Sequence, residues 1–214
     1  MSGIQVWFRE LPSPLRWTLL SILGALALAL VASAVWSWRG RQEAAAQTAL
    51  SPVAATAQRS VASGQTGELE AAAKALRDFL AQHSATRAGQ QGWYLLGQVE
   101  FRRQLWDAAV TAYAEAARRD GGTIAVLSRL GEGLALEAKG EAARAVEAYQ
   151  QSLSGRGPKD FLYGELLLAK ARAQELSKDS AGAVATYKLY LKDLPASERL
   201  EDVRIRLALL GSPA

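Results

Sequence analysis

Few residues in this chain could do catalytic or metal chemistry. The 214-residue sequence has one histidine, His83, and no cysteine. Without cysteine the chain lacks disulfides, thiol nucleophiles and thiolate metal ligands, and cysteine usage does not distinguish an oxidising from a reducing compartment. His83 follows a helix-forming stretch, at whose C-terminus a polar or cationic side chain complements the helix dipole. We therefore expect no metal site, no cofactor and no catalytic histidine.

Two glycine-containing stretches and one group of acids resemble parts of known catalytic motifs. Residues 131–133, GEG, lack the third glycine and the acidic partner of a dinucleotide-binding fingerprint. Residues 155–159, GRGPK, are not followed by the Gly-Lys-Ser/Thr of a phosphate-binding loop. Glu198, Glu201 and Asp202 are expected in the first turns of a helix, where acids complement the dipole. We interpret all three as structural features, and the chain is not predicted to be an enzyme.

The positive charge of the chain is concentrated near its N-terminus. The sequence has 25 basic and 21 acidic residues and a pI of about 9.5. Five of the basic and two of the acidic residues lie in 1–66, which leaves 20 against 19 for 67–214. A groove that follows nucleic-acid phosphates needs clustered, unbalanced cations. The larger part of the chain is nearly neutral, so we expect no nucleic-acid partner.

Residues 17–38 contain no charged side chain. A helix of this length reaches about 33 Å, which exceeds the roughly 30 Å of a bilayer core. Tryptophans near both ends lie beside arginines, as in the belts that form at membrane surfaces. We predict a single transmembrane helix over 17–38, preceded by a short N-terminal tail over 1–16.

A cleaved signal peptide is the alternative for this segment. Residues 19–31 have the length of a signal-peptide apolar region, and the small residues 32–34 satisfy the cleavage rule. The long preceding segment and the apolar VWSW beyond the cleavage position favour the membrane anchor. Orientation is open, because two arginines precede the span and two follow it closely, so the positive-inside rule is tied.

Residues 39–66 are poor in large side chains and are predicted to be a juxtamembrane helix or a linker. A weak apolar stripe has helical spacing, and Pro52 is compatible with a helix only near its start. Residues 64–67, GQTG, are expected to form a turn. The stripe consists of Leu50, Val53, Ala54, Ala57 and Val61.

Beyond this segment the sequence repeats. Three tyrosines, each four residues after an alanine, are separated by 36 and 38 residues, and small residues also recur on the helix before each of them. Small residues that face each other let two helices approach, while the large residues around them interlock. Glycine inside a helix costs about 1 kcal/mol relative to alanine, so its recurrence indicates a close packing contact. The residues assigned to this packing are Trp93, Gly97, Ala109, Tyr113, Gly131, Ala145, Tyr149, Ala169, Ala183 and Tyr187.

This pattern resembles the tetratricopeptide repeat, whose 34-residue unit has Trp, Leu-Gly, Tyr, Ala, an aromatic residue, Ala and Pro at fixed offsets. Residues 90–123 match it, although Glu100 replaces the usual tyrosine and Gly121 the proline. In the next two copies the assigned small positions, Gly131 to Ala145 and Ala169 to Ala183, are two residues further apart than in the first.

The resemblance implies an all-α fold, in which the single transmembrane helix is followed by a right-handed solenoid of helix-turn-helix repeats. Three to four repeats occupy residues 67–195, beginning with a degenerate copy, and a capping helix and tail follow over 196–214, with Ser197 as the expected N-cap. The degenerate copy contains Ala72, Leu76 and Phe79, and the buried face of the capping helix contains Leu200, Val203, Leu207 and Leu210.

Solenoids of this family expose the first helix of each pair on a concave face. By resemblance to tetratricopeptide proteins that bind extended peptides, this face is the expected binding groove, and simple surface exposure is the alternative role for each residue on it. The chain has no asparagine, so the asparagine-dependent clamp for chaperone tails is not expected. The implied groove residues are Tyr94, Gln98, Phe101, Arg102, Ser128, Arg129, Glu132, Tyr163, Leu167, Lys170 and Gln174.

The layout of a short anchor followed by a small repeat domain is similar to the bacterial ancillary subunit of the Sec translocon. The shared features are the tryptophan-flanked span ending in VWSWRGR, the alanine-rich segment after it and about four repeats. The similarity implies a single-pass inner-membrane protein with periplasmic repeats, which acts as a non-catalytic scaffold for protein partners such as the translocon or chaperones. Two alternatives stay open: a signal-cleaved periplasmic adaptor for envelope assembly, and an accessory or sensor subunit of an enzyme complex.

The chain is expected to remain in the membrane with residues 39–214 outside the cytoplasm. The uncharged span supplies the anchor, and the family resemblance supplies the direction. Protease added to spheroplasts should then remove the repeat domain while a cytoplasmic marker stays intact. Protection of the domain beside an intact marker contradicts this orientation, and a mature N-terminus at Val35 establishes signal cleavage instead.

Overall fold

The computed structural model describes residues 12–118 and 122–212, and all regular structure in this part of the chain is α-helical. The all-α prediction is confirmed for these residues. Residues 1–11, most of the expected tail, and Gly121 lie outside them. The helices are α2 (Ser13–Ser63), α3 (Thr66–His83), α4 (Arg87–Arg102), α5 (Trp106–Ala117), α6 (Thr123–Lys139), α7 (Ala142–Leu153), α8 (Tyr163–Leu176), α9 (Ser180–Asp193) and α10 (Leu200–Leu209).

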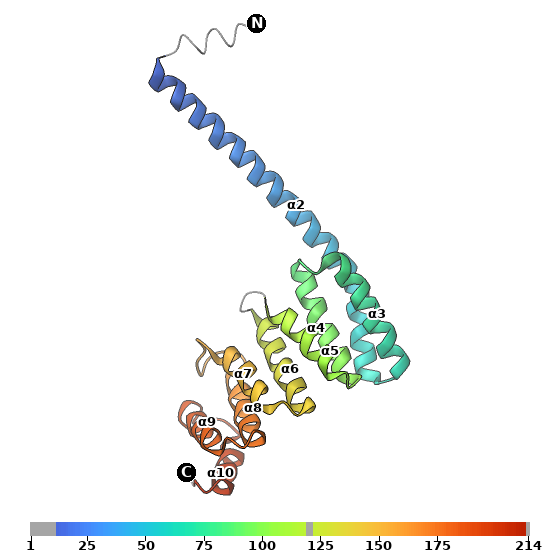
Figure 1. The fold of residues 1–214 in the computed structure, drawn as a ribbon, viewed down its shortest axis with the longest axis vertical. Coiled ribbons are helices and arrows are strands. Elements are labelled where there is room, and N and C mark those ends of the chain that lie inside the picture. Colours follow the sequence, from blue (N-terminus) through green and yellow to red (C-terminus); the bar gives the residue numbers. More distant parts are fainter. Residues whose placement is uncertain (1–11, 119–121, 213–214) are drawn as a thin grey trace. The chain divides into compact units, whose positions relative to one another are not determined.

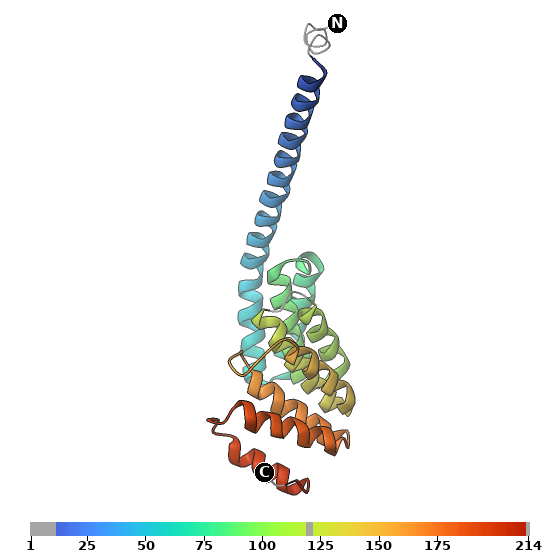
Figure 2. The same ribbon diagram turned by 90° about the vertical axis from the view of Figure 1, so that its left-hand side faces the viewer.

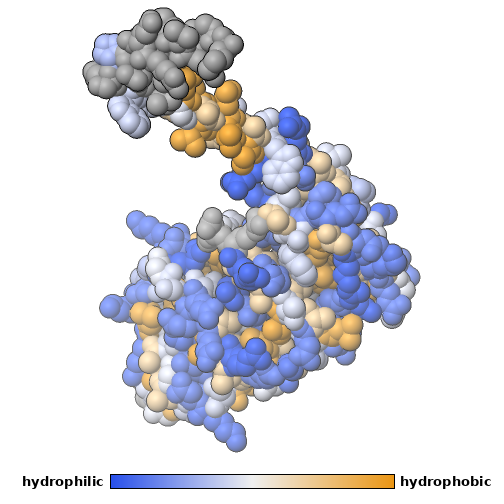
Figure 3. Space-filling model, turned by 45° about the horizontal axis from the view of Figure 1, so that its top comes forward, coloured by the Kyte–Doolittle hydropathy of each residue, from blue (hydrophilic) through white to orange (hydrophobic). Residues whose placement is uncertain are grey.

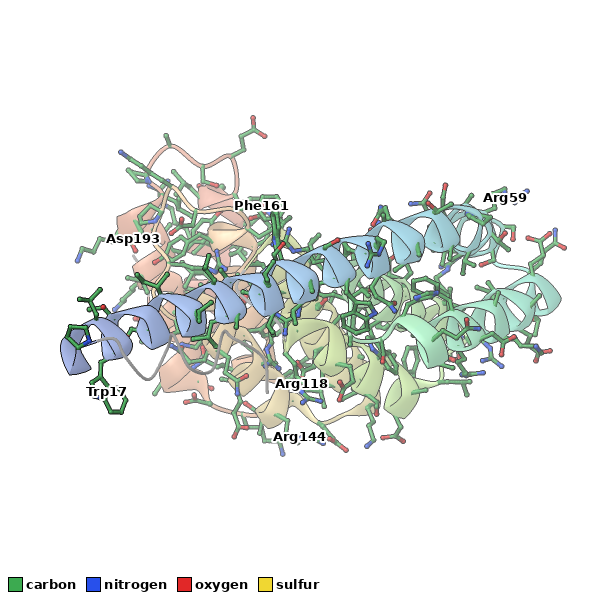
Figure 4. All side chains as sticks on the ribbon, turned by 90° about the horizontal axis from the view of Figure 1, so that it is seen from above. Trp17, Arg59, Arg118, Arg144, Phe161 and Asp193 are labelled. Carbon is green, nitrogen blue, oxygen red and sulfur yellow. The ribbon has the colours of Figure 1, made fainter. Side chains whose placement is uncertain are left out.

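The chain divides into two compact units, Met1–Ala45 and Ala46–Ala214, and α2 contributes to both. In the first unit α2 carries exposed apolar side chains, which Figure 3 shows in orange. Trp17 projects from this helix (Figure 4) and is 71% exposed. Residues Ser21–Ser63 form a helix long and apolar enough to cross a membrane, a property that signal sequences share.

The second unit begins with residues 46–63 of α2, which are helical rather than a linker. Leu50 and Ala57 are buried in a cluster with side chains of α3, and the remaining residues of the predicted stripe are partly buried there. Pro52 was compatible only with a helix start, yet it lies inside α2. Its ring is exposed and packing buries the opposite face, so the helix continues through it despite one missing N–H donor.

Helices α3 to α10 stack in chain order (Figures 1 and 2). Each helix contacts its neighbours in sequence, and contacts also join α4 to α6 and α6 to α8. The chain therefore forms helix pairs, and the first helices of the last three pairs touch each other. The pairs are residues 46–63 with α3, α4 with α5, α6 with α7, and α8 with α9, and α10 follows them.

One spacing recurs in all four pairs. A small residue on the first helix precedes an alanine on the second by 12 residues and a large residue by 16. The members are buried in every pair. The four sets are Ser60–Ala72–Leu76, Gly97–Ala109–Tyr113, Gly133–Ala145–Tyr149 and Ala171–Ala183–Tyr187.

The assignment that placed the small positions of the later pairs two residues further apart is therefore wrong. Gly133 and Ala171, not Gly131 and Ala169, correspond to Gly97. A Cβ atom added at Gly133 would lie 2.2 Å from the Tyr149 ring of its own pair, whereas one at Gly131 would lie 2.6 Å from the Tyr113 ring of the preceding pair. Gly131 thus provides a contact between pairs.

Tyr113 is held between two helices by glycine. A Cβ atom at Gly97 or at Gly131 would approach the Tyr113 ring to 2.6 Å, which is closer than Cβ atoms approach other atoms in proteins. The ring therefore rests on the backbone of α4, in its own pair, and on that of α6, in the next pair. This contact explains why glycine is needed in both helices despite its low helix propensity.

Helix α10 begins later than expected. Ser197 was predicted as its N-cap, but the helix starts at Leu200, and Arg199 occupies the cap position. The Ser197 hydroxyl instead lies 2.6 Å from the Tyr190 hydroxyl and accepts a hydrogen bond from the Arg199 amide. The predicted apolar face does pack inward, because Val203 and Leu207 are buried and Leu200 and Leu210 are partly buried.

We expect Gly131→Leu and Ala145→Leu each to lower the free energy of unfolding by about 1–3 kcal/mol, because a large side chain has no room between the packed helices. Thermal unfolding of the full chain in detergent measures the effect. Gly67→Leu in the first turn of α3 is the matched control, since its Cβ atom would meet nothing within 4 Å. Equal unfolding temperatures for Gly131→Leu and Gly67→Leu would refute the role assigned to Gly131.

Candidate functional site

One cleft in the second unit lies on the first helices of the pairs. It has a volume of about 460 Å³, and its walls come mainly from α6, α8 and α10. Equivalent positions on successive helices line it, so the repeat itself builds the cleft. The lining residues are Leu130, Leu134, Glu165, Leu168, Ala169, Arg172, Tyr187, Arg199, Asp202, Val203, Ile205 and Arg206.

Two rows of side chains follow from the recurring spacing. One row lies three residues before the small position of each first helix, and the other lies one residue after it. On α10, Arg206 lies beside Glu175 as Arg172 lies beside Glu137, so the position that corresponds to the small residue is Ile205, which is 53% exposed. From α4 to α10 the first row is Tyr94, Leu130, Leu168 and Asp202, and the second is Gln98, Leu134, Arg172 and Arg206.

The middle of the cleft is apolar. Leu130 and Leu134 on α6 and Leu168 on α8 are half-buried, so part of each side chain faces the cleft. Covering such surface stabilises a complex by about 25 cal/mol per Å² of apolar area removed from water. This floor is suited to apolar side chains of a ligand.

A buried tyrosine and an arginine hold one carboxylate at the edge of the floor. The Tyr149 hydroxyl donates to Glu137 at 2.6 Å, and Arg172 donates to both oxygens of Glu137 at 2.9 and 3.1 Å. Burial and the Glu137 carboxylate raise the pKa of Tyr149, and the hydrogen bond to Glu137 raises the pKa of Arg172. The bidentate contact joins α6 to α8 and orients the Arg172 guanidinium in the cleft.

The same arrangement recurs one repeat later. Tyr187 donates to Glu175 at 2.6 Å, and Arg206 of α10 lies 3.7 Å from Glu175. Burial is the main cause of the raised pKa of Tyr187, and the hydrogen bond to Glu175 raises this pKa further. In the preceding pair the glutamate position is Phe101, so Tyr113 has no corresponding carboxylate. The arginines therefore enter the cleft only toward its C-terminal end.

The α4 end of the surface is aromatic. Gln98 donates to the Tyr94 hydroxyl at 3.0 Å, and the Tyr94 and Tyr113 rings are 6.0 Å apart. Phe101 packs edge-on against Trp106 at 5.1 Å, and Arg102 is exposed. Burial raises the pKa of Tyr94. The four expected residues of α4 thus lie together on its partly exposed face.

Four residues expected in the groove are buried instead: Ser128, Tyr163, Leu167 and Gln174. The shift of two residues in the register places Ser128 of α6 and Gln174 of α8 inside the protein. Tyr163 donates to Asp193 at 2.7 Å, and Gln174 accepts from Thr186 at 2.7 Å. These side chains pack the fold and are not available to a ligand.

The other three expected residues lie at the surface but outside the cleft lining. Arg129 donates to Glu132 at 2.6 Å, one turn along α6. Lys170 donates to Gln150 at 2.6 Å, and partial burial lowers its pKa. None of the three is brought together with the α4 residues.

The expected packing residues lie in the interior or at its edge. Ala109, Ala145 and Ala183 are inaccessible, and Ala169 is buried. Trp93 is partly buried against the cluster formed by the first two pairs. Glu100, at the position of the usual tyrosine, is buried, pairs with Arg103 at 2.8 Å and bonds to Arg77.

The single histidine packs at the end of α3. The His83 ring lies 5.0 Å from the Phe79 ring. Its Nδ1 atom is buried and finds no hydrogen-bond partner among the described residues. Within the same residues, no three His, Asp or Glu side chains converge so as to hold a metal ion.

None of the groove residues expected from the sequence lines this cleft. The signal that identifies it is the constant interval of 16 residues between small residue and tyrosine, from Gly97 to Tyr113 and from Gly133 to Tyr149. The stretch GEG contains both candidates for the small position, Gly131 and Gly133. Gly131 follows a leucine, as in the Leu-Gly motif of the repeat. Only the contact of Gly133 with Tyr149 distinguishes them.

No protein family, no curated protein and no solved structure matches this chain.

We expect Tyr149→Phe to lower the free energy of unfolding by about 1–2 kcal/mol, because Glu137 loses a hydrogen-bond donor in a largely buried position. Tyr113→Phe is the matched control: it occupies the same repeat position, and no hydrogen bond to its hydroxyl is found among the described residues. Chemical denaturation of both variants measures the difference. Equal losses in the two variants would contradict a stabilising contact between Tyr149 and Glu137.

Proposed function

We propose that this protein is a membrane-anchored scaffold of the tetratricopeptide type, which binds a segment of a partner protein in the cleft on its first helices. One observation carries the proposal: equivalent positions of α6, α8 and α10 line a single cleft, with leucines in its middle and arginines at one end. A stack of repeats that presents the same positions side by side forms an extended surface, and such surfaces accommodate peptide segments.

The cleft combines the two kinds of contact that peptide recognition needs. Leu130, Leu134 and Leu168 offer apolar area, and Arg199 and Arg206 carry exposed guanidinium groups. Apolar burial is the dominant favourable contribution to most associations, and a few placed polar groups fix the orientation of the ligand. Tyr94 and Gln98 continue the same two rows onto α4.

The anchor and the partner class rest on resemblance. The apolar helix of the first unit fits a single inner-membrane span, and the similarity to the ancillary Sec subunit favours periplasmic repeats with the translocon or chaperones as partners. If the segment is cleaved, the same cleft serves a soluble periplasmic adaptor for envelope assembly. An accessory or sensor subunit of an enzyme complex is the remaining alternative.

The double variant Leu134→Gln/Leu168→Gln tests the cleft. Partners are captured by crosslinking in membranes and identified, and their recovery is compared with that of the wild-type chain. We expect at least a tenfold loss, about 1.4 kcal/mol, because two apolar contacts are replaced by polar groups. Circular dichroism should show an unchanged helical fold.

Leu189→Gln is the matched control, because Leu189 is 40% exposed on α9 and does not line the cleft. Recovery of the main partner should be unchanged in this variant. If the cleft variant retains full capture while Leu189→Gln loses it, the partner binds the second helices and the proposed function of the cleft is wrong.

A further inference from the structure

A second cleft adjoins the proposed groove. It has a volume of about 490 Å³ and lies between the loop before α8 and the turn after α9. Glu165 lines both clefts, so the two clefts are neighbours on α8. Its walls include Tyr163, Tyr190 and two prolines.

Every charged side chain that lines this second cleft is an acid: Asp160, Glu165 and Asp193. None of them forms an ion pair with any described residue, although most acids elsewhere in the second unit do. Lys159 and Lys192 are adjacent in sequence but exposed, and they do not line the cleft. Unpaired acids are therefore gathered here.

Two helix ends meet at the cleft. Asp193 is the last residue of α9, so the negative end of that helix dipole lies there, while Glu165 in the first turn of α8 complements the positive end of the α8 dipole. Asp193 accepts a hydrogen bond from Tyr163 at 2.7 Å, and Asp160 accepts one from the Gly157 amide at 2.6 Å. These single bonds fix the two carboxylates and leave acceptor capacity for a ligand, since an ionised carboxylate has about four lone-pair sites.

The kind of cation follows from the geometry. The three carboxylates do not converge closely enough to form a metal site. A lysine or arginine side chain instead has several donors at the end of an apolar stem, and that stem packs well on tyrosine and proline. The tyrosine and proline walls of the cleft match the apolar stem, and its carboxylates match the cationic end.

We propose that the second cleft binds a lysine or arginine side chain of the same partner segment whose apolar residues occupy the leucine floor. This inference rests on the proposed function of the groove and adds the chemistry of its ligand: an apolar segment followed by a basic residue. The basic residue points toward the α8–α9 end, because Glu165 connects the two clefts.

The test uses the full chain in detergent and short fluorescein-labelled peptides with identical leucine spacing, which end in lysines, glutamates or glutamines. Fluorescence anisotropy should give at least tenfold tighter binding of the lysine peptide than of the glutamate peptide. Glu165→Gln/Asp193→Asn should reduce this preference at least fivefold. Glu147→Gln, an exposed acid on α7 that lines neither cleft, is the matched control and should retain it.

The outcomes separate the two proposals. Equal binding of all three peptides, weakened by Leu134→Gln, would support the groove and overturn the basic-residue inference. A lysine preference that needs Glu165 and Asp193 but is indifferent to Leu134→Gln would support the acidic cleft and contradict the groove. A preference that survives in Glu165→Gln/Asp193→Asn overturns the inference, as does failure of every peptide to bind.

Discussion

The arrangement of the helix pairs depends on aromatic rings that rest directly on helix backbone. Tyr113 contacts Gly97 in its own pair and Gly131 in the next pair, and any side chain at either glycine would overlap the ring. Tyr149 contacts Gly133 in the same way. Because a ring is rigid and a backbone cannot move aside cheaply, such contacts set the distance and rotation between helices more narrowly than contacts between flexible side chains. Here that geometry comes with a loss of helix propensity at each glycine.

The candidate site is a consequence of this constraint. Once the small position of each first helix faces its tyrosine, the residues three before and one after it lie together on an adjacent face, about 60–100° around the helix, because these two residues are four apart. Leu130, Leu134, Leu168 and Arg172 then line one cleft. The Glu137 carboxylate, held by Tyr149, orients Arg172 from the next pair. The packing of the tyrosines, the orientation of Arg172 and the lining of the cleft therefore all follow from the register of the first helices.

Charge distinguishes neighbouring parts of this surface, although residues 67–214 are nearly neutral. In the groove each arginine lies beside an acid of its own or the adjacent helix, as Arg199 does with Asp202 at 3.0 Å. In the adjoining cleft the acids have no ion-pair partner among the described residues. Burying an unpaired charge is costly, so such groups normally stay accessible to water or to a ligand cation. A partner that carries both apolar and basic residues would satisfy both regions, which is the basis of the proposed recognition.

The sequence by itself determined the helical class, the uncharged segment near the N-terminus and the recurrence of tyrosine with alanine four residues before it, because composition and periodicity report local preference and burial. It also identified the apolar face of the last helix. Only the tertiary structure decided the register of the first helices. Gly131 and Gly133 are both small and both buried, and they differ only in which tyrosine they meet. That difference of two residues decides that Ser128 and Gln174 are buried and that Leu134 and Arg172 line the cleft, because a shift of two residues turns a helical position through about 200°.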